Sequence, residues 1–314
     1  MKKIVVAESL ADSGKELLRA NGFEIVETDG TVADALVKAP DAYGLLLGTK
    51  KITNEQILQF ENLKIIARNG VGFNNIDVDF CAQHGIWVTI TPTANASTVA
   101  ETTLAEMFDL SKNIYNDSTA MRNGNFSDYK HSHRGFDLAG KTLGILGFGR
   151  IGQMVAKKAS QLDMKIIYND RFAKENDVAT AVSREELFKT ADIITLHMAV
   201  TPETANSIGK AEFDMMKNSA SLINLARGEL VKTDDLIAAL KNHDIYGAAL
   251  DVFDQEPLPM DSELFQLENV LLTPHIASNT VECMNRMAVD AAGEIVKVVK
   301  DNVAPQWPVV KGVK

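Results

Sequence analysis

Cysteine and long apolar segments are scarce in this sequence of 314 residues. The two cysteines, Cys81 and Cys283, lie far apart and in no metal-ligand spacing, which argues against a disulfide framework or a zinc site and favours a reducing, cytoplasmic setting. No run approaches the ~18 apolar residues that a membrane helix needs, so no membrane association is expected. The start, Met1–Glu8, has a basic pair and an apolar run that ends at once in charge, which indicates a first strand and not a signal peptide.

Positive charge is also in short supply, since 32 Lys and Arg stand against 42 Asp and Glu, for a net charge of -10. This balance opposes a general attraction to nucleic acid or to an anionic membrane, so neither is expected as a partner. The hydrophobic fraction of 46% and the charged fraction of 24% are ordinary for a globular protein, which excludes disordered and fibrous classes. The length suggests about two domains of ~150 residues.

The most informative stretch is a G-x-G-x-x-G motif after an apolar run, with glycines at 147, 149 and 152. Gly147 allows the tight turn, Gly149 lets the backbone approach a pyrophosphate, and Gly152 lets the following helix pack closely. A second strand ends at Asp170, 18 residues after Gly152, where an acid is expected to bind the ribose of NAD and to repel the 2′-phosphate of NADP. Neighbouring Arg171 could partly offset that repulsion. Because strand, helix, strand and acid occur together, we interpret the unit as a dinucleotide site whose helix N-terminus faces the phosphates.

Strands and helices alternate along the rest of the chain, which predicts parallel sheets covered by helices. The rhythm breaks at Thr91–Ser97, and a capping box at Thr98–Glu101 opens an amphipathic helix reaching about Tyr115. A last helix near Thr280–Lys300 is expected to return to the first domain. We therefore predict an α/β fold of two Rossmann- or flavodoxin-like doubly wound parallel-sheet domains with the active site in the cleft between them: a discontinuous substrate domain, 1–97 with 280–314, and an NAD-binding domain, 98–279. The apolar positions assigned to the first of these helices are Val99, Leu104, Met107, Phe108, Leu110 and Ile114.

Three further clusters follow predicted strands: Ile223–Gly228, Asp251–Pro257 and Leu272–Ala277. In order and spacing they resemble the signature blocks of the D-isomer-specific 2-hydroxyacid dehydrogenases, most closely the phosphoglycerate dehydrogenase branch in its short form without a regulatory extension. The resemblance covers essentially the whole chain, including Arg68–Asp77, which is similar to the substrate loop of that family.

The resemblance implies that Arg227 anchors the substrate carboxylate and carbonyl, that His275 is the general acid/base, and that Glu256 is its partner. The chemistry fits, because a forked guanidinium suits a carboxylate and histidine donates protons near neutral pH. Taken singly, these residues would be interpreted as a capped turn, a loop and a bystander histidine. Together, after a dinucleotide fold, they are interpreted as a catalytic set.

The resemblance also implies contacts to cofactor and substrate. Substrate binding is assigned to Arg68, to the backbone around Val71 and Gly72, and to Arg227. Cofactor contacts are assigned to Thr91, Gly147, Gly149, Arg150, Ile151, Gly152, Asp170, Ala226, Asp251 and Ala277, with Asp251 near the nicotinamide amide. The positions that depart from the family pattern are Asn69, Phe73, Met198 and Ala277. The changes in the substrate loop leave the exact substrate open. No metal is expected, since His131 and His133 have no further ligand at useful spacing.

The chain is thus expected to be a homodimeric NAD-dependent oxidoreductase that transfers a hydride between NAD(H) and a small 2-hydroxy or 2-keto acid. The favoured substrate pair is 3-phosphoglycerate and 3-phosphohydroxypyruvate of serine biosynthesis, because Arg68 and the basic positions Lys130, His131, His133 and Arg134 could hold a phosphate. A solvated basic loop without a ligand is the competing interpretation. Alternatives are a reductase of hydroxypyruvate, glyoxylate or another 2-keto acid and, from another class, a non-catalytic NAD-sensing protein like the C-terminal-binding corepressors.

Overall fold

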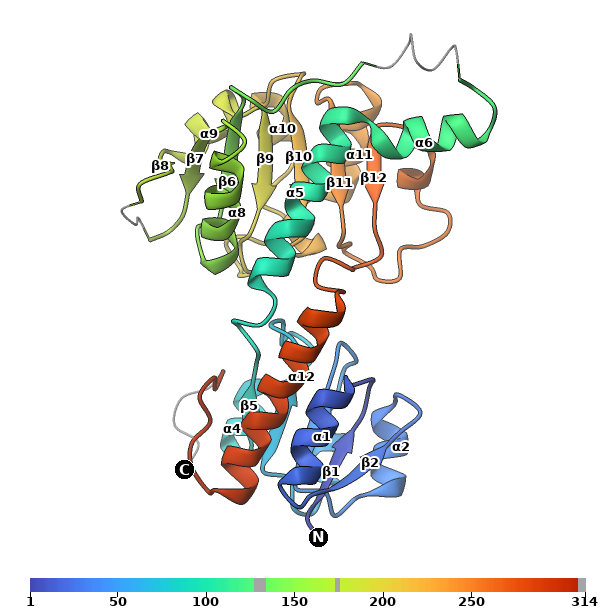
Figure 1. The fold of residues 1–314 in the computed structure, drawn as a ribbon, viewed down its shortest axis with the longest axis vertical. Helices are drawn as coiled ribbons and strands as arrows, with labels where there is room; N and C mark the ends of the chain where they lie inside the picture. Colours follow the sequence, from blue (N-terminus) through green and yellow to red (C-terminus); the bar gives the residue numbers. More distant parts are fainter. Residues whose placement is uncertain (127–133, 173–175, 310–314) are drawn as a thin grey trace. The chain divides into compact units, whose positions relative to one another are not determined.

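Parallel strands form two separate sheets in this protein, whose computed structural model describes residues 1–126, 134–172 and 176–309 (Figure 1). The chain divides into unit 1, Met1–Asn95 with Asn279–Lys314, and unit 2, Ala96–Ser278. These bounds lie within two residues of the domain limits expected from the sequence. No helix in the described ranges combines the length and the apolar character needed to span a bilayer.

Unit 1 contains a five-stranded sheet in the order β2-β1-β3-β4-β5, the flavodoxin-like arrangement. Every neighbouring pair is parallel. Its strands are β1 (Lys3–Val6), β2 (Glu24–Glu27), β3 (Gly44–Leu47), β4 (Ile65–Arg68) and β5 (Trp87–Thr89). They are short and mostly buried runs, as the apolar sequence pattern predicts for a sheet covered on both faces.

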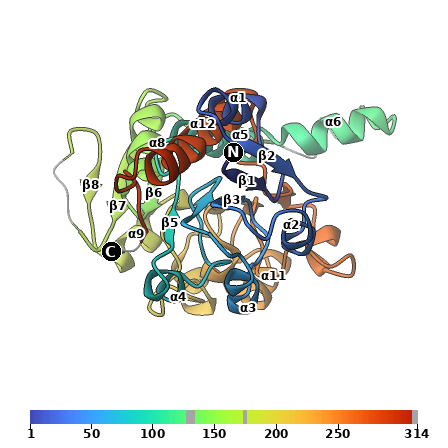
Figure 2. The ribbon, with the colours of Figure 1, turned by 90° about the horizontal axis from the view of Figure 1, so that it is seen from below.

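The two faces of this sheet are covered by helices from opposite ends of the chain. On one face lie α1 (Asp12–Ala20) and α12 (Val281–Ile295), which continues as a π-helical turn, Val296–Lys300. On the other lie α2 (Val32–Lys38), α3 (Asn54–Leu58) and α4 (Val78–Gln83). Figure 2 shows α1 and α12 side by side, apart from α2, α3 and α4. The C-terminal helix therefore does return to the N-terminal sheet, as the sequence predicts.

Unit 2 contains a seven-stranded sheet in the order β12-β11-β10-β9-β6-β7-β8. Its strands are β6 (Thr142–Leu146), β7 (Lys165–Asn169), β8 (Thr180–Ala181), β9 (Ile193–Leu196), β10 (Ser221–Asn224), β11 (Gly247–Leu250) and β12 (Val270–Leu272). Read from β8, this is the Rossmann order extended by one strand, and the strand order reverses between β6 and β9. In such sheets a ligand binds at the carboxyl ends of the strands near that reversal.

Two layers of helices bury the faces of this second sheet. The first layer is α5 (Ala96–Lys112) and α8 (Arg150–Ser160), and the second is α9 (Arg184–Thr190), α10 (Lys210–Met215) and α11 (Thr233–Lys241). Short 3-10 turns at Gly228–Leu230 and Glu263–Gln266 complete the connections. The cores consist mainly of aliphatic side chains, and Phe148, within the glycine motif, stacks on Tyr168.

The helix after the domain boundary differs from its predicted course. α5 begins at Ala96, so Thr98 lies inside the helix and does not cap it, and the Ser97 hydroxyl donates to Glu101 instead at 3.2 Å. Asn113 adopts a left-handed conformation with φ 57°, which ends α5 before α6 (Ile114–Arg122). Figure 1 shows α6 extending sideways past β12. Two of the apolar positions assigned to the predicted helix are exposed: Phe108, within α5, and Ile114, at the start of α6.

Candidate active site

Three loops that carry predicted site residues start from neighbouring strands. The ends of β10, β11 and β12 are in register, with Asn224 opposite Leu250 and Leu250 opposite Leu272. Arg227, Asp251 and His275 follow these strand ends, so all three lie at the carboxyl edge of the sheet. Adjacent strands are about 4.8 Å apart, which places the first and third of these loops roughly 10 Å from one another.

His275 and Glu256 form a direct pair. The imidazole Nδ1 lies 2.8 Å from Glu256 Oε2, and the other carboxylate oxygen accepts the backbone N–H of Phe253 at 3.0 Å. Both side chains remain partly exposed, at 42% and 37%. Glu256 therefore fixes the ring through Nδ1, which leaves Nε2 as the ring nitrogen that can serve a substrate.

Asp251 organises the loop that carries His275. Its side chain is fully buried, and Oδ1 accepts the Thr273 hydroxyl at 2.6 Å and the Ile276 N–H at 2.7 Å. Oδ2 accepts the Ala277 N–H at 2.8 Å. These hydrogen bonds show that the Asp251 carboxylate holds the loop around His275 in place. The sequence did not suggest this role. Its predicted contact to the nicotinamide amide remains a prediction, as does that of Ala277.

Arg227 stands on a tightly packed turn. Asn224 braces the turn from both sides, since its amide donates to the Arg227 carbonyl at 2.8 Å and its side-chain oxygen accepts the Ala226 N–H at 3.1 Å. Gly228 has no room for a side chain, because a Cβ there would lie 1.9 Å from the backbone of Phe253. The turn therefore packs against the start of the segment that leads to Glu256. The guanidinium is half-buried and donates to the Ala226 carbonyl at 2.5 Å.

The glycine motif forms the turn that a dinucleotide needs. Gly147 has φ 90°, and a Cβ there would lie 2.6 Å from the backbone of His197. A Cβ on Gly152 would lie 2.3 Å from the Gly147 carbonyl oxygen, whereas the space beside Gly149 is open. α8 begins at Arg150, directly after Gly149 and without a side-chain cap, and the first turn of a helix carries backbone N–H groups without intrahelical partners. These features fit the pyrophosphate of NAD. Arg150 and Ile151 belong to this first turn.

Asp170 comes directly after β7, as predicted, and contacts the glycine turn. Its Oδ2 accepts the Phe148 N–H at 2.5 Å, and its Oδ1 accepts the Phe172 N–H at 2.8 Å. Arg171 points to Glu203, with 3.7 Å between the charged groups. Both side chains are largely exposed, at 63% and 69%, so this ion pair is weak. The contact of Asp170 to a ribose remains a prediction.

The substrate loop assigned to unit 1 follows β4. Arg68 is buried, and its Nη1 donates to the Asn69 carbonyl at 2.7 Å, so the guanidinium lies against its own loop. The Thr91 N–H donates to the Gly70 carbonyl at 2.9 Å, which joins two of the predicted segments. The Thr91 hydroxyl is buried and has no hydrogen-bond partner in the described part of the chain. Val71 and Gly72 are half-buried in the same loop.

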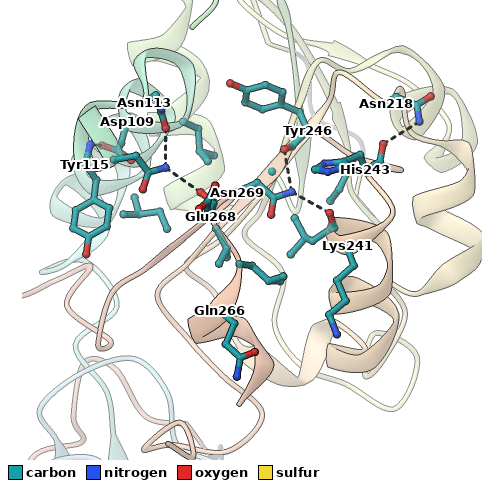
Figure 3. A pocket seen from close by; sticks show the side chains of 18 of the residues that line it. Asp109, Asn113, Tyr115, Asn218, Lys241, His243, Tyr246, Gln266, Glu268 and Asn269 are labelled. Carbon is teal, nitrogen blue, oxygen red and sulfur yellow. Dashed lines mark hydrogen bonds between the residues drawn. The ribbon is translucent and has the colours of Figure 1, made fainter. Parts of the chain in front are cut away.

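Of the four basic positions in the loop assigned to a phosphate, Arg134 is the one that the structure describes. Lys130, His131 and His133 lie outside the described residues. Arg134 lines a cavity of about 610 Å³ together with Tyr115, Tyr246 and Gly247 (Figure 3). Gly247 is the first residue of β11, so this cavity opens at the amino edge of the sheet, one strand length or ~13 Å from His275. Arg134 therefore lies away from His275 within this unit, and its part in binding a phosphate remains a prediction.

Another histidine near the glycine turn is unsuited to proton transfer. His197 Nε2 lies 3.1 Å from the Thr195 hydroxyl. Burial lowers the pKa of His197 to about 3, so the ring is neutral at physiological pH. This supports the sequence-based interpretation of His197 as a structural residue.

Comparison with known proteins gives a consistent assignment. Residues 104–277 match the model of the D-isomer specific 2-hydroxyacid dehydrogenase NAD binding domain. The chain is 38% identical to D-3-phosphoglycerate dehydrogenase of Methanocaldococcus jannaschii, over 97% of this chain and 59% of that protein, so it spans about three fifths of that relative. It is 40% identical to glyoxylate reductase of Thermococcus litoralis, over 86% of this chain and 83% of that protein. The crystal structure of the TT0316 protein from Thermus thermophilus superimposes with a TM-score of 0.92 at 34% identity, covering 98% of this chain and 100% of that one.

Proposed function

Since the chain belongs to the D-isomer-specific 2-hydroxyacid dehydrogenases, which are NAD-dependent oxidoreductases, we propose that it reacts through Arg227, His275 and Glu256. The observation that carries this proposal is the 2.8 Å contact between His275 Nδ1 and Glu256 Oε2 at the carboxyl edge of the NAD-binding sheet. A cytoplasmic setting, in which the buried Cys81 and Cys283 stay reduced, belongs to the same proposal.

Each of the three side chains has a distinct task in the reduction of a 2-keto acid. When bound, NADH supplies the hydride for the substrate carbon. Arg227 holds the carboxylate and the carbonyl oxygen with its planar fork of N–H donors. His275 gives a proton from Nε2 to the carbonyl oxygen, or takes it from the hydroxyl in the reverse direction. Glu256 holds Nδ1 so that the ring keeps its orientation and tautomer as the proton moves.

We propose 3-phosphohydroxypyruvate, the keto form of 3-phosphoglycerate, as the favoured substrate. Support comes from the similarity to an archaeal D-3-phosphoglycerate dehydrogenase and from Arg68, a cation at the start of the predicted substrate loop. Hydroxypyruvate or glyoxylate is the second candidate. It is favoured by the way Arg68 lies against Asn69, by the position of Arg134 at the opposite sheet edge, and by the similarity to a glyoxylate reductase.

Substitution of Arg68 separates these substrates. If a phosphate is bound, Arg68→Ala should lower kcat/KM for 3-phosphohydroxypyruvate by roughly 10- to 100-fold, which is the value of one hydrogen bond to a charged group. The kcat/KM for hydroxypyruvate and glyoxylate should change much less. The measurement is a panel of these keto acids with NADH, and Arg134→Ala is the matched control that should leave the preference intact. Equal use of phosphorylated and unphosphorylated acids by the wild type would reject the phosphate and select the second candidate.

We also propose that the protein is a homodimer whose contact includes α6. This helix exposes Ile114, Tyr115 and Met121 by 54 to 58%, an unusual display of apolar surface beside the cavity of Figure 3. An isologous pairing of two such faces would bury it.

Light scattering should therefore give about twice the chain mass of 34.2 kDa. Met121→Asp should shift the mass toward one chain, because the dimer would have to bury an unpaired charge. Val37→Asp, at a position in α2 that is 82% exposed, is the control and should remain dimeric. A single-chain mass for the wild type at micromolar concentration would contradict the proposal.

A further inference from the structure

A buried carboxyl group lies one contact away from the loop of His275. Glu106 belongs to α5, and its side chain is only 3% exposed. Its Oε1 lies 3.2 Å from the Thr273 hydroxyl, and its Oε2 has no hydrogen-bond partner in the described part of the chain. No salt bridge in that part reaches Glu106. An ionised carboxylate in such surroundings would be costly, so the neutral acid is the expected form.

The hydrogen bonds of Thr273 also indicate that Glu106 is protonated, because the Thr273 hydroxyl has fewer protons than it has acceptors. The Thr273 hydroxyl lies 2.6 Å from Asp251 Oδ1 as well as 3.2 Å from Glu106 Oε1, yet it has a single proton to donate. Asp251 also accepts the N–H groups of Ile276 and Ala277, which is the environment of an ionised carboxylate. The Thr273 proton therefore goes to Asp251, and the Thr273 oxygen can only accept from Glu106. That requires a proton on Glu106.

The charges that face Glu106 agree with this assignment. Burial raises the pKa of Glu106 to about 8, and the charge of Asp251 acts in the same direction. The other charged group that acts on it is Asp109, one turn along α5, which is also an acid and whose own pKa burial raises. Because the Thr273 hydroxyl proton is taken by Asp251, it does not stabilise an ionised Glu106. Near neutral pH, Glu106 therefore keeps its proton.

The loop that these hydrogen bonds hold contains a residue in an unfavourable backbone conformation. His275 has φ 54°, in the left-handed region, which costs a non-glycine residue about 1 kcal/mol or more unless the surroundings enforce it. Asp251 enforces it by binding Thr273 before the histidine and Ile276 and Ala277 after it. A second negative charge on Glu106 would repel Asp251 and remove the donor that orients the Thr273 hydroxyl.

We propose that Glu106 is a positioning residue that, as the neutral acid, donates through Thr273 to Asp251 and so fixes the loop that presents His275. The inference rests on the proposed role of His275 in proton transfer. It also sets an upper pH limit, because deprotonation of Glu106 loosens the loop as the pH rises through the ionisation of this carboxyl.

The kinetic test compares Glu106→Gln with Glu106→Leu in the oxidation of the best D-2-hydroxy acid from the panel. Glutamine has the same shape and an amide donor that does not titrate, so kcat should stay within about twofold of wild type at pH 7 and should keep its value at alkaline pH, where wild type declines. Leucine keeps the volume but has no donor, and its kcat should fall by about three- to tenfold at every pH, the loss of one hydrogen bond. Glu101→Gln is the matched control. Glu101 is an acid on the same helix, but it pairs with Lys158 at 3.0 Å, so its substitution should leave the alkaline decline of wild type unchanged.

A second measurement does not depend on turnover. Between the unfolded-state pKa near 4.5 and the folded-state value of about 8, only the folded wild type keeps the Glu106 proton. Its stability therefore falls as the pH rises through this interval. Glu106→Gln lacks this dependence, so the difference in Tm between variant and wild type should grow from pH 5 to pH 8 and stay level above. This series is informative even if no substrate in the panel is turned over.

The outcomes are distinct. A Tm difference that does not change with pH would overturn the protonated state of Glu106. If the Tm difference changed with pH but kcat declined equally at alkaline pH in wild type and Glu106→Gln, the positioning role would be overturned. Glu106 would then be a purely structural acid. Both effects together support the proposal.

Discussion

Replacement of His275 by asparagine should lower kcat for keto-acid reduction by about 10²- to 10⁴-fold, the usual contribution of a positioned general acid. Asparagine is chosen because it tolerates the left-handed conformation that His275 adopts, with φ 54°. The loop should therefore keep its shape while the proton donor is lost. Tight binding of NADH, followed by fluorescence, should be retained, since the glycine turn belongs to other strands of the same sheet.

His243→Asn is the matched control for this variant. His243 also has a left-handed backbone, with φ 55°, but it lines the cavity at the opposite edge of the sheet. The same change of residue type in the same conformation should leave kcat near that of wild type. Loss of activity in both variants would mean that the backbone, and not the imidazole, was disturbed. Full activity of His275→Asn would remove His275 from the mechanism.

The sequence predicted the parts of this protein that depend on local pattern. The glycine motif, the acid at Asp170 and the alternation of strands with helices indicated the fold class, because parallel α/β units repeat a short-range rule. The pairing of Glu256 with His275 was implied by the resemblance to the 2-hydroxyacid dehydrogenases. The local sequence could not show it, because the two residues follow separate strands that meet only through the order of the sheet. The structure supplies that order, with β11 and β12 adjacent.

Features that depend on tertiary contacts were harder to predict. The sequence around Ser13 resembles a capping box, yet α1 begins at Asp12 and the Ser13 hydroxyl donates to the Asn285 side chain of α12 at 2.8 Å. Asn285 is 272 residues away along the chain, so no local pattern reports the competing partner. The break at Asn113 was missed for a similar reason, because the apolar positions continue across it without interruption.

Glu106 is the functional candidate that the sequence interpretation missed, although the sequence contains a signal that could have indicated it. It occupies the buried face of α5 with Thr103, Met107 and Leu110, all at helical spacing. An acid in such a stripe is costly unless it is neutral or paired, and that alone could have marked it. Its partner Thr273 could not have been identified, because 167 residues separate the two.

Replacement of Arg227 by alanine should lower kcat/KM for the best keto acid by about 10²- to 10⁴-fold. A bidentate guanidinium makes two charge-assisted hydrogen bonds to a carboxylate, each worth about 1.5–3 kcal/mol. Arg227→Lys should recover only a small part of this loss, because a lysine ammonium is a point charge without the planar fork. If Arg227 also polarises the carbonyl oxygen, kcat should fall together with the rise in KM. Steady-state kinetics over a range of keto-acid concentrations at saturating NADH provides both kcat and KM.

The matched control for Arg227 is Arg184→Ala in the same unit. Like Arg227, Arg184 donates to a backbone carbonyl, that of Ser207 at 2.6 Å. It differs in position, because it precedes β9 and forms an ion pair with Glu212 of α10 at 3.5 Å. Its loss should lower Tm, because this ion pair is partly buried, with side-chain exposures of 34% and 19%, and should leave kcat/KM within a few-fold of wild type. A further control is a keto compound without a carboxylate, for which Arg227→Ala should lose less than for a keto acid, because only the contact to the carbonyl oxygen is removed. If Arg227→Ala reduced turnover of acids and of uncharged ketones by the same factor, the guanidinium would act on the turn that Asn224 braces and not on the substrate carboxylate.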